Sequence, residues 1–131
     1  MNVPQDGLFS GARPSFARIG VAAGRVGVID VGSNSVRLVV FDQPSRAPGY
    51  FFNEKVACGL GAEIARTGRL APEGRARALA TLRRFAALAA RMKVGALDAL
   101  ATAAVREAVD GADFAEQVRR ETGLRLTVID G

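Results

Sequence analysis

Histidine is absent from this 131-residue chain, and cysteine occurs once, at Cys58. Without histidine the chain lacks the side chain that ordinarily titrates near neutral pH, so Ser-His and Cys-His catalysis within it are excluded. A single cysteine excludes an internal disulfide bond and a metal site built from several cysteines, and its default role is that of a small buried apolar residue. Chemistry in this chain must therefore rest on carboxylates, hydroxyl groups, arginine side chains and bound metal.

Long hydrophobic runs are absent as well. No apolar stretch approaches the roughly 20 residues that cross a bilayer, and the N-terminal segment lacks the continuous apolar core of a secretory signal. We therefore expect no membrane partner, and a cytoplasmic location that agrees with the low cysteine content. Residues 1–24 hold scattered Arg, Ser, Pro and Gly, so we interpret them as a flexible N-terminal extension.

The composition that remains is typical of one compact domain. Hydrophobic residues make up 49% of the chain and charged residues 24%, which is enough apolar content to bury a core. The formal net charge is +5 and the isoelectric point is near 10.6, which favours a polyanionic partner such as polyphosphate, a nucleotide or nucleic acid. Arginine greatly outnumbers lysine, a bias that the base composition of the source genome also explains.

A short polar turn between two β-rich runs is the most informative segment. Apolar residues 26–29 precede it and β-branched and aromatic residues 36–41 follow it, which predicts a hairpin. The turn reads Asp30-Val31-Gly32-Ser33-Asn34-Ser35. Its glycine, serines and asparagine expose N–H groups and add hydroxyl and amide donors that suit phosphate oxygens, whereas Asp30 suits Mg²⁺ or a bridging water. The alternative is an ordinary hairpin turn closed by an Asx hydrogen bond.

The rest of the chain alternates strand and helix patterns. The predicted elements are a strand (50–57), a glycine-punctuated loop (59–70), a helix (72–92), a strand running into a helical turn (97–108), a helix capped by Asp110 and Asp113 and closed at Gly123, and a strand (125–129). The order β-β-β-α-β-α-β predicts an α/β fold with a mixed sheet, in which an antiparallel meander is extended by parallel strands through helical crossovers. This is the order of a ribonuclease H-like lobe, the half-unit of actin-like phosphotransferases.

Three separated segments together resemble the exopolyphosphatase and guanosine pentaphosphate phosphohydrolase (Ppx/GppA) family of the actin-like ATPase superfamily. The first covers residues 29–38 and contains the polar turn. The second runs from Gly59-Leu60-Gly61 to Pro72-Glu73, and the third covers residues 101–108 with Phe114 and Thr122-Gly123 after it. Each motif alone is moderately specific, but all three occur in the family's order. The resemblance spans residues 25–131.

This resemblance implies hydrolysis of the terminal phosphate of inorganic polyphosphate, or of the 5′ γ-phosphate of guanosine pentaphosphate, assisted by Mg²⁺. It implies that Asp30 holds Mg²⁺ or its water shell. The implied phosphate-binding residues are Gly32, Ser33, Asn34, Ser35, Arg37 and Thr102, although strand alternation leaves open which face of the sheet Arg37 occupies.

Arg106 follows a strand end, where the resemblance implies that it stabilises charge on the transferred phosphoryl group. An ion pair with Glu107 is equally compatible with this position. Glu107 is interpreted as a group that orients Arg106 and not as the general base.

Two positions depart from the family pattern: Ala103 replaces a serine, and Asp130 replaces the serine of a closing Ile-Ser-Gly. In the family a Glu-Glu-Ala segment follows and supplies the general base, so the resemblance places that glutamate beyond Gly131. We therefore expect residues 25–131 to be the N-terminal lobe of a longer enzyme, truncated at its C-terminus and inactive alone. Its uncovered apolar face predicts a homodimer or other self-association.

Two other hypotheses stay open. The chain is a polyanion-binding module without catalysis if its arginines act as a diffuse basic surface. Arg77, Arg84 and Arg91 recur every seven residues on the long helix, but a solvated helix face is the simpler interpretation. The chain is otherwise a lobe of another actin-like ATPase or sugar kinase, although the third segment has no reason to recur in kinases. Nucleic acid is not expected as the partner of the enzyme.

Overall fold

The computed structural model describes residues 24–42 and 50–130. The predicted N-terminal extension, apart from Gly24, and the polar segment at residues 43–49 lie outside the described residues.

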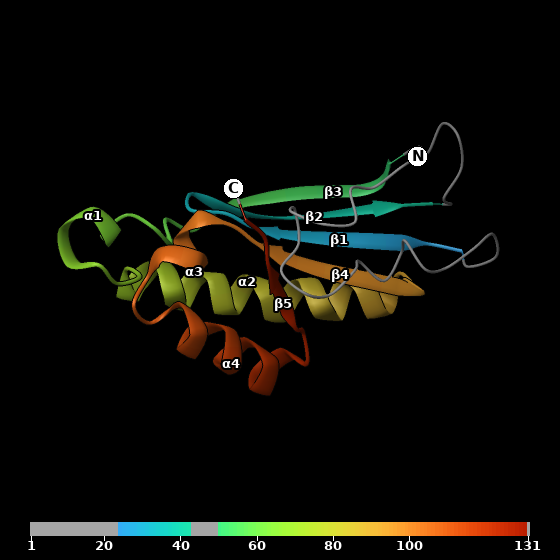
Figure 1. Cartoon of the computed structure of the whole chain (residues 1–131). Coiled ribbons are helices and arrows are strands. Elements are labelled where there is room, and N and C mark those ends of the chain that lie inside the picture. The colour runs from blue at the N-terminus through green and yellow to red at the C-terminus, as the bar shows by residue number, and fades with distance from the viewer. Residues whose placement is uncertain (1–23, 43–49, 131) are drawn as a thin grey trace.

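A single mixed sheet organises the described part of the chain (Figure 1). Its strands are β1 (Val26–Val31), β2 (Ser35–Phe41), β3 (Tyr50–Ala57), β4 (Ala96–Ala101) and β5 (Leu126–Val128). They lie in the order β3-β2-β1-β4-β5. The β1–β2 and β2–β3 pairs are antiparallel, and the β1–β4 and β4–β5 pairs are parallel. The predicted fold, a ribonuclease H-like lobe with an antiparallel meander and parallel extensions, is confirmed.

Within the described residues, four helices accompany the sheet: α1 (Ile64–Thr67), α2 (Pro72–Arg91), α3 (Ala103–Glu107) and α4 (Gly111–Thr122). The long helix α2 begins with Pro72 at its first position and Glu73 in its first turn, where a missing N–H and a negative charge are both favourable. It ends at Arg91, before Lys93 adopts a left-handed conformation with φ of 56°. The short helix α1 lies inside residues 59–70, for which the sequence predicts a loop. Its four residues carry too little periodicity to be recognised as a helix from the sequence.

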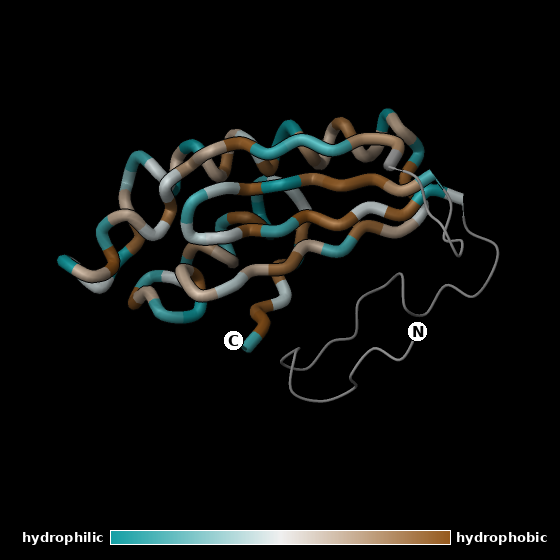
Figure 2. The backbone as a smooth tube through the Cα atoms, turned by 90° about the horizontal axis from the view of Figure 1, so that it is seen from above, coloured by the Kyte–Doolittle hydropathy of each residue, from teal (hydrophilic) through white to brown (hydrophobic). Residues whose placement is uncertain are grey.

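The hydrophobic core lies between the sheet and α2. Leu82 and Phe85 of α2 are fully buried, as are alternate residues of β1 and β2: Ile29, Val31, Val36, Leu38 and Val40. Figure 2 shows hydrophobic residues in brown along the inner strands. Burying a leucine or phenylalanine side chain contributes about 1.5–3 kcal/mol, so this packing fixes which face of the sheet meets the helix. Cys58 is buried, which confirms its predicted role as a small core residue.

The start of α4 corrects one prediction. Asp110 and Asp113 are the predicted caps of this helix, but neither side chain makes a capping hydrogen bond there. Asp110 Oδ1 instead accepts the N–H of Leu70 at 2.9 Å, and both aspartates pair with Arg75. The carboxylate of Asp110 therefore joins segments that are about 40 residues apart in the sequence.

Among the residues that the structure describes, no helix is both long enough and apolar enough to span a bilayer.

Candidate phosphate-binding site

The polar turn between β1 and β2 lies at the end of the sheet beyond which α1 projects (Figure 1). The N–H of Gly32 donates to the carbonyl of Ser35 at 2.9 Å and closes the turn. Ser33 and Asn34 form its tip, and Asn34 is exposed. The predicted hairpin is therefore present, and its serine and asparagine residues lie at the carboxyl end of β1.

The turn is braced from the side of β3. The carbonyl of Asn34 accepts the N–H groups of Cys58 (2.9 Å) and Gly59 (3.0 Å), and the carbonyl of Ser33 accepts the N–H of Gly61 (2.9 Å). Since the Ser33 carbonyl and the Asn34 N–H belong to one trans peptide, that N–H points away from the bracing segment. The brace thus leaves a main-chain donor free at the tip, within the part of the chain described, as an anion-binding turn requires.

Gly61 lies where three segments meet. A Cβ built on Gly61 would lie 3.0 Å from the Cβ of Ser33 and 3.3 Å from the Cβ of Ala104, which is in α3. A side chain here would therefore force the polar turn and α3 apart by a few tenths of an ångström. The three segments that resemble one family in sequence are thus in contact at one edge of the sheet.

Thr102 joins this edge from the end of β4. Its N–H donates to the carbonyl of Val31 at 3.1 Å, and its hydroxyl lies 3.4 Å from the same carbonyl. These bonds fasten the end of β4 beside the end of β1. The role of Thr102 toward phosphate stays a prediction.

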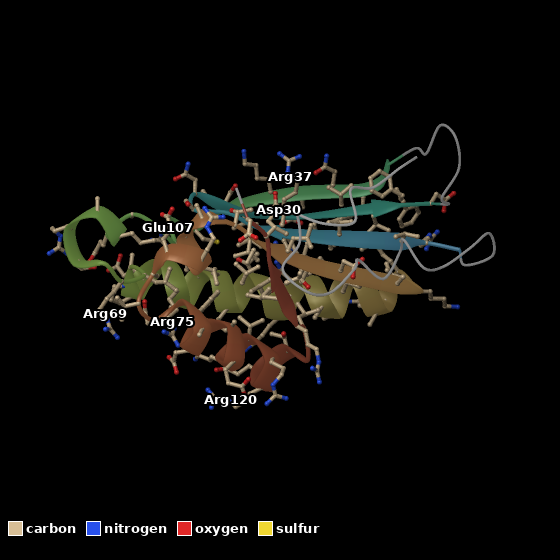
Figure 3. The ribbon with its side chains drawn as sticks, in the orientation of Figure 1. Asp30, Arg37, Arg69, Arg75, Glu107 and Arg120 are labelled. Carbon is tan, nitrogen blue, oxygen red and sulfur yellow. The ribbon has the colours of Figure 1, made fainter. Side chains whose placement is uncertain are left out.

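Asp30 and Arg37 lie on the face of the sheet opposite α2 (Figure 3). The buried neighbours Ile29 and Val31 face α2, so strand alternation turns Asp30 the other way. Asp30 and Arg37 are direct partners across the β1–β2 ladder. The guanidinium of Arg37 donates to the side-chain oxygen of Asn53 on β3 at 3.3 Å. The structure thus settles the face that Arg37 occupies, while its contact with phosphate stays a prediction.

The described residues contain no cluster of three or more histidine, cysteine, aspartate or glutamate side chains that would hold a metal ion alone. Mg²⁺ bound to phosphorylated substrates commonly uses one or two carboxylates, with phosphate oxygens and water completing its shell. Asp30, exposed and two residues before Gly32, fits such a shared site as a single carboxylate ligand. It does not fit a metal site made by the protein alone.

Arg106 is held at the end of β5. One guanidinium nitrogen donates to the carbonyl of Ile129 at 2.8 Å, and another lies 3.6 Å from the Glu107 carboxylate. The ion pair considered from the sequence is therefore present. Its predicted role toward the phosphoryl group stays a prediction.

The carboxylate of Asp110, whose side chain is 11% exposed, lies among hydrogen-bond donors and positive charges. Burial is the largest single influence on the pKa of Asp110 and acts to raise it, whereas hydrogen bonds from the N–H groups of Leu70 and of Asp110 itself act to lower it. The positive charges of Arg69 and Arg75, both labelled in Figure 3, act in the same direction. The pKa of Asp110 consequently lies below its ordinary value, and the carboxylate stays ionised in the folded protein.

Sequence reasoning missed the brace formed by residues 58–61 and the contacts of Asp110. The brace acts through main-chain groups, which leave no side-chain signature. The spacing Gly59-Leu60-Gly61 was its one visible signal, since paired glycines permit close approach of two backbones.

Fold and site together define a class of protein: a ribonuclease H-like lobe of the actin-like kind, with a glycine-serine turn presented at the edge of its sheet. The chain belongs to the Ppx/GppA phosphatase family, whose sequence pattern matches residues 38–131.

Named relatives agree with this assignment. Exopolyphosphatase 1 of Mycobacterium bovis is 34% identical over 108 residues, which cover 82% of this chain and 31% of the relative. The crystal structure of the Aquifex aeolicus Ppx/GppA family member superposes with a TM-score of 0.79 at 32% identity, covering 83% of this chain and 36% of that one. An exopolyphosphatase from Cytophaga hutchinsonii gives a TM-score of 0.76 at 34% identity, covering 82% and 34%.

The chain thus spans about a third of the length of the relatives it matches. Family membership favours a phosphatase lobe over the lobe of a kinase or of another actin-like ATPase.

Proposed function

We propose that this chain supplies the phosphate-binding lobe of an enzyme that hydrolyses terminal phosphoanhydride bonds. The substrate is inorganic polyphosphate or guanosine pentaphosphate, and Mg²⁺ assists. The observation that carries the proposal is the contact of the polar turn, the Gly59–Gly61 segment and the start of α3 at one sheet edge. The names of the relatives, exopolyphosphatases, favour polyphosphate.

In this proposal the polar turn binds the terminal phosphate through residues 32–35, which we call the phosphate turn. The free main-chain N–H and the side-chain amide of Asn34, together with the hydroxyl groups of Ser33 and Ser35, donate to phosphate oxygens. The absence of a side chain at Gly32 lets the phosphate approach the backbone. Mg²⁺, when bound through Asp30, neutralises charge on the phosphates. Arg106 stabilises negative charge on the transferred group.

Binding of tripolyphosphate by isothermal titration calorimetry tests the role of the turn. We expect Ser33→Ala and Asn34→Ala each to weaken binding roughly ten- to hundredfold, because a hydrogen bond to a charged group contributes about 1.5–3 kcal/mol. Glu116→Gln, at an exposed position of α4, is the control and should bind like wild type. Equal affinity of all three variants and wild type would refute the assignment of the turn.

A polyanion-binding module without catalysis is the second candidate, because Arg77 and Arg91 on α2 are exposed and have no ion-pair partner among the described residues. A diffuse basic surface of this kind binds with strong salt dependence and does not need the turn. Affinity that is unchanged by Ser33→Ala and Asn34→Ala, together with a steep salt dependence, favours the module over the phosphatase lobe.

We further propose that the 131-residue chain releases no phosphate by itself, since the general base implied by the family has no counterpart within residues 25–131. We also propose that the protein is located in the cytoplasm and that the chain self-associates. Robust Mg²⁺-dependent phosphate release by the isolated chain would contradict the first point, and a concentration-independent monomer in sedimentation velocity would contradict the last.

A further inference from the structure

The loop that braces the phosphate turn is a closed unit. It comprises residues 60–71, and we call it the α1 loop. The N–H of Ala71 donates to the carbonyl of Leu60 at 3.1 Å, so the two ends of the loop are tied together. The side chains of Leu60 and Leu70 are buried in the core, while α1 projects beyond the end of the sheet (Figure 1).

The returning half of the α1 loop is fastened to the junction between α3 and α4. Asp110 Oδ1 accepts the N–H of Leu70 at 2.9 Å, and the N–H of Val109 donates to the carbonyl of Gly68 at 2.8 Å. Asp110 Oδ2 also accepts from Arg75 at 3.3 Å. The side chains of Asp110 and Arg75 are only 11% and 20% exposed, so water competes little for these bonds.

The departing half of the α1 loop reaches the phosphate turn. Gly61 donates its N–H to the carbonyl of Ser33 at 2.9 Å and packs against that residue. Because the hydrogen bond between Ala71 and Leu60 joins the two ends of the loop, we expect a displacement of Leu70 to move Gly61 as well. One continuous set of contacts therefore runs from Asp110 to the turn.

We propose that Asp110 is a positioning residue for the phosphate turn: it fixes the α1 loop through the N–H of Leu70, and the α1 loop fixes the carbonyl of Ser33. Asp110 itself does not touch the ligand. The proposal rests on the proposed function, because a turn held in its binding conformation loses less freedom when phosphate binds.

Two substitutions distinguish the contribution of the hydrogen bond between Asp110 and Leu70 from that of the negative charge of Asp110. In Asp110→Asn the side-chain oxygen still accepts the N–H of Leu70, but the ion pair with Arg75 is lost. Asp110→Ala removes both. Asp113→Ala is the matched control, because Asp113 also pairs with Arg75, at 2.7 Å, and its side chain is 72% exposed. Among the described residues, Asp113 has no side-chain hydrogen bond or ion pair with the α1 loop.

Amide hydrogen exchange of the whole 131-residue chain tests the proposal without a ligand. We expect Asp110→Ala to accelerate exchange at Gly61 as well as at Leu70 by about tenfold, while Asp110→Asn and Asp113→Ala leave Gly61 within about twofold of wild type. If Asp110→Ala fails to fold, Asp110→Ser takes its place, since it retains an N-cap residue with a shorter side chain. Faster exchange at Leu70 with Gly61 unchanged would show a purely local role and overturn the proposal.

Tripolyphosphate binding separates this proposal from the proposed function. We expect Asp110→Ala to bind about five- to tenfold more weakly than wild type, and Asp110→Asn and Asp113→Ala to bind like wild type. If wild type binds and Asp110→Ala binds equally well, the positioning role is overturned and the proposed function stands. If wild type does not bind, the proposed function fails, and the exchange at Gly61 alone decides whether Asp110 fixes the turn.

Discussion

At the scale of single residues, the candidate site depends on main-chain groups as much as on side chains. Three N–H groups of residues 58–61 hold the carbonyls of Ser33 and Asn34. This arrangement turns the Asn34 N–H outward, and no side-chain substitution removes that donor. Single alanine substitutions in the turn are therefore expected to weaken phosphate binding without abolishing it.

Two glycines of the site should respond differently to alanine. A Cβ at Gly61 would lie 3.0 Å from Ser33, whereas a Cβ at Gly32 would meet only the carbonyl of Ser35, at 3.4 Å. We expect Gly61→Ala to cost about 1–3 kcal/mol of unfolding free energy through overpacking, measured by urea denaturation, and also to weaken phosphate binding.

Gly32→Ala is the comparison for this prediction. It should leave the free energy of unfolding nearly unchanged and lower phosphate affinity only, since its added methyl group stands where phosphate approaches. Equal losses of stability in the two variants would show that Gly61 is not the tight contact.

The hairpin turn could be predicted from the sequence, because glycine, serine and asparagine between two apolar runs are typical turn residues. The face of the sheet that Arg37 occupies could not be predicted from the sequence. Strand alternation gives the face of a residue only when the burial of a neighbouring residue is known. The buried positions of Val36 and Leu38 supply that information in the structure.

At the scale of elements, the strands and α2 could be predicted because their periodicity extends over many residues. The short helices α1 and α3 contain four and five residues, too few for such a signal, although a helical turn after β4 was expected. The N-cap rule failed at α4, because a tertiary donor, the N–H of Leu70, holds the carboxylate of Asp110.

The tertiary contacts of Asp110 should appear in the pH dependence of stability. Its folded-state pKa is lowered, so its stabilising contribution is complete above the unfolded pKa of about 3.9 and is lost as pH falls through the folded value. The charged groups that face it are Arg69 and Arg75, with Asp113 sharing Arg75.

Urea denaturation between pH 7 and pH 2 checks this prediction. Wild type should lose more stability than Asp110→Asn between about pH 5 and pH 2, because the variant has no proton to bind at this position. The pKa values of Glu54 and Glu116 are also lowered, chiefly by side-chain hydrogen bonds from Arg84 and Arg119, and both remain in the variant. Parallel acid profiles for the two proteins would contradict the prediction.

At the scale of the whole molecule, the net charge of +5 draws any polyanion to the surface. Much of the arginine is already paired: Arg83 with Glu121, and Arg84 with Glu54, form ion pairs between elements. General attraction to the surface and specific capture at the turn therefore have to be told apart by location and not by affinity alone.

The described surface offers limited apolar area for self-association. Phe51, 46% exposed, and Val109, 75% exposed, are its exposed large hydrophobic residues within residues 24–42 and 50–130. Arg25 stacks over the ring of Phe51 with 3.6 Å between its guanidinium carbon and the ring centroid. Self-association stays a prediction for sedimentation measurements.

The most direct test of the phosphate turn is an NMR titration of the isotope-labelled chain with tripolyphosphate at physiological salt. We predict saturable amide shifts concentrated at residues 32–35, 59–61 and 102–104, the three segments that meet at Gly61, and loss of these shifts in the combined Ser33→Ala, Asn34→Ala variant. Shifts confined to the arginine-bearing faces of α2 and α4, unchanged in that variant, would contradict the account.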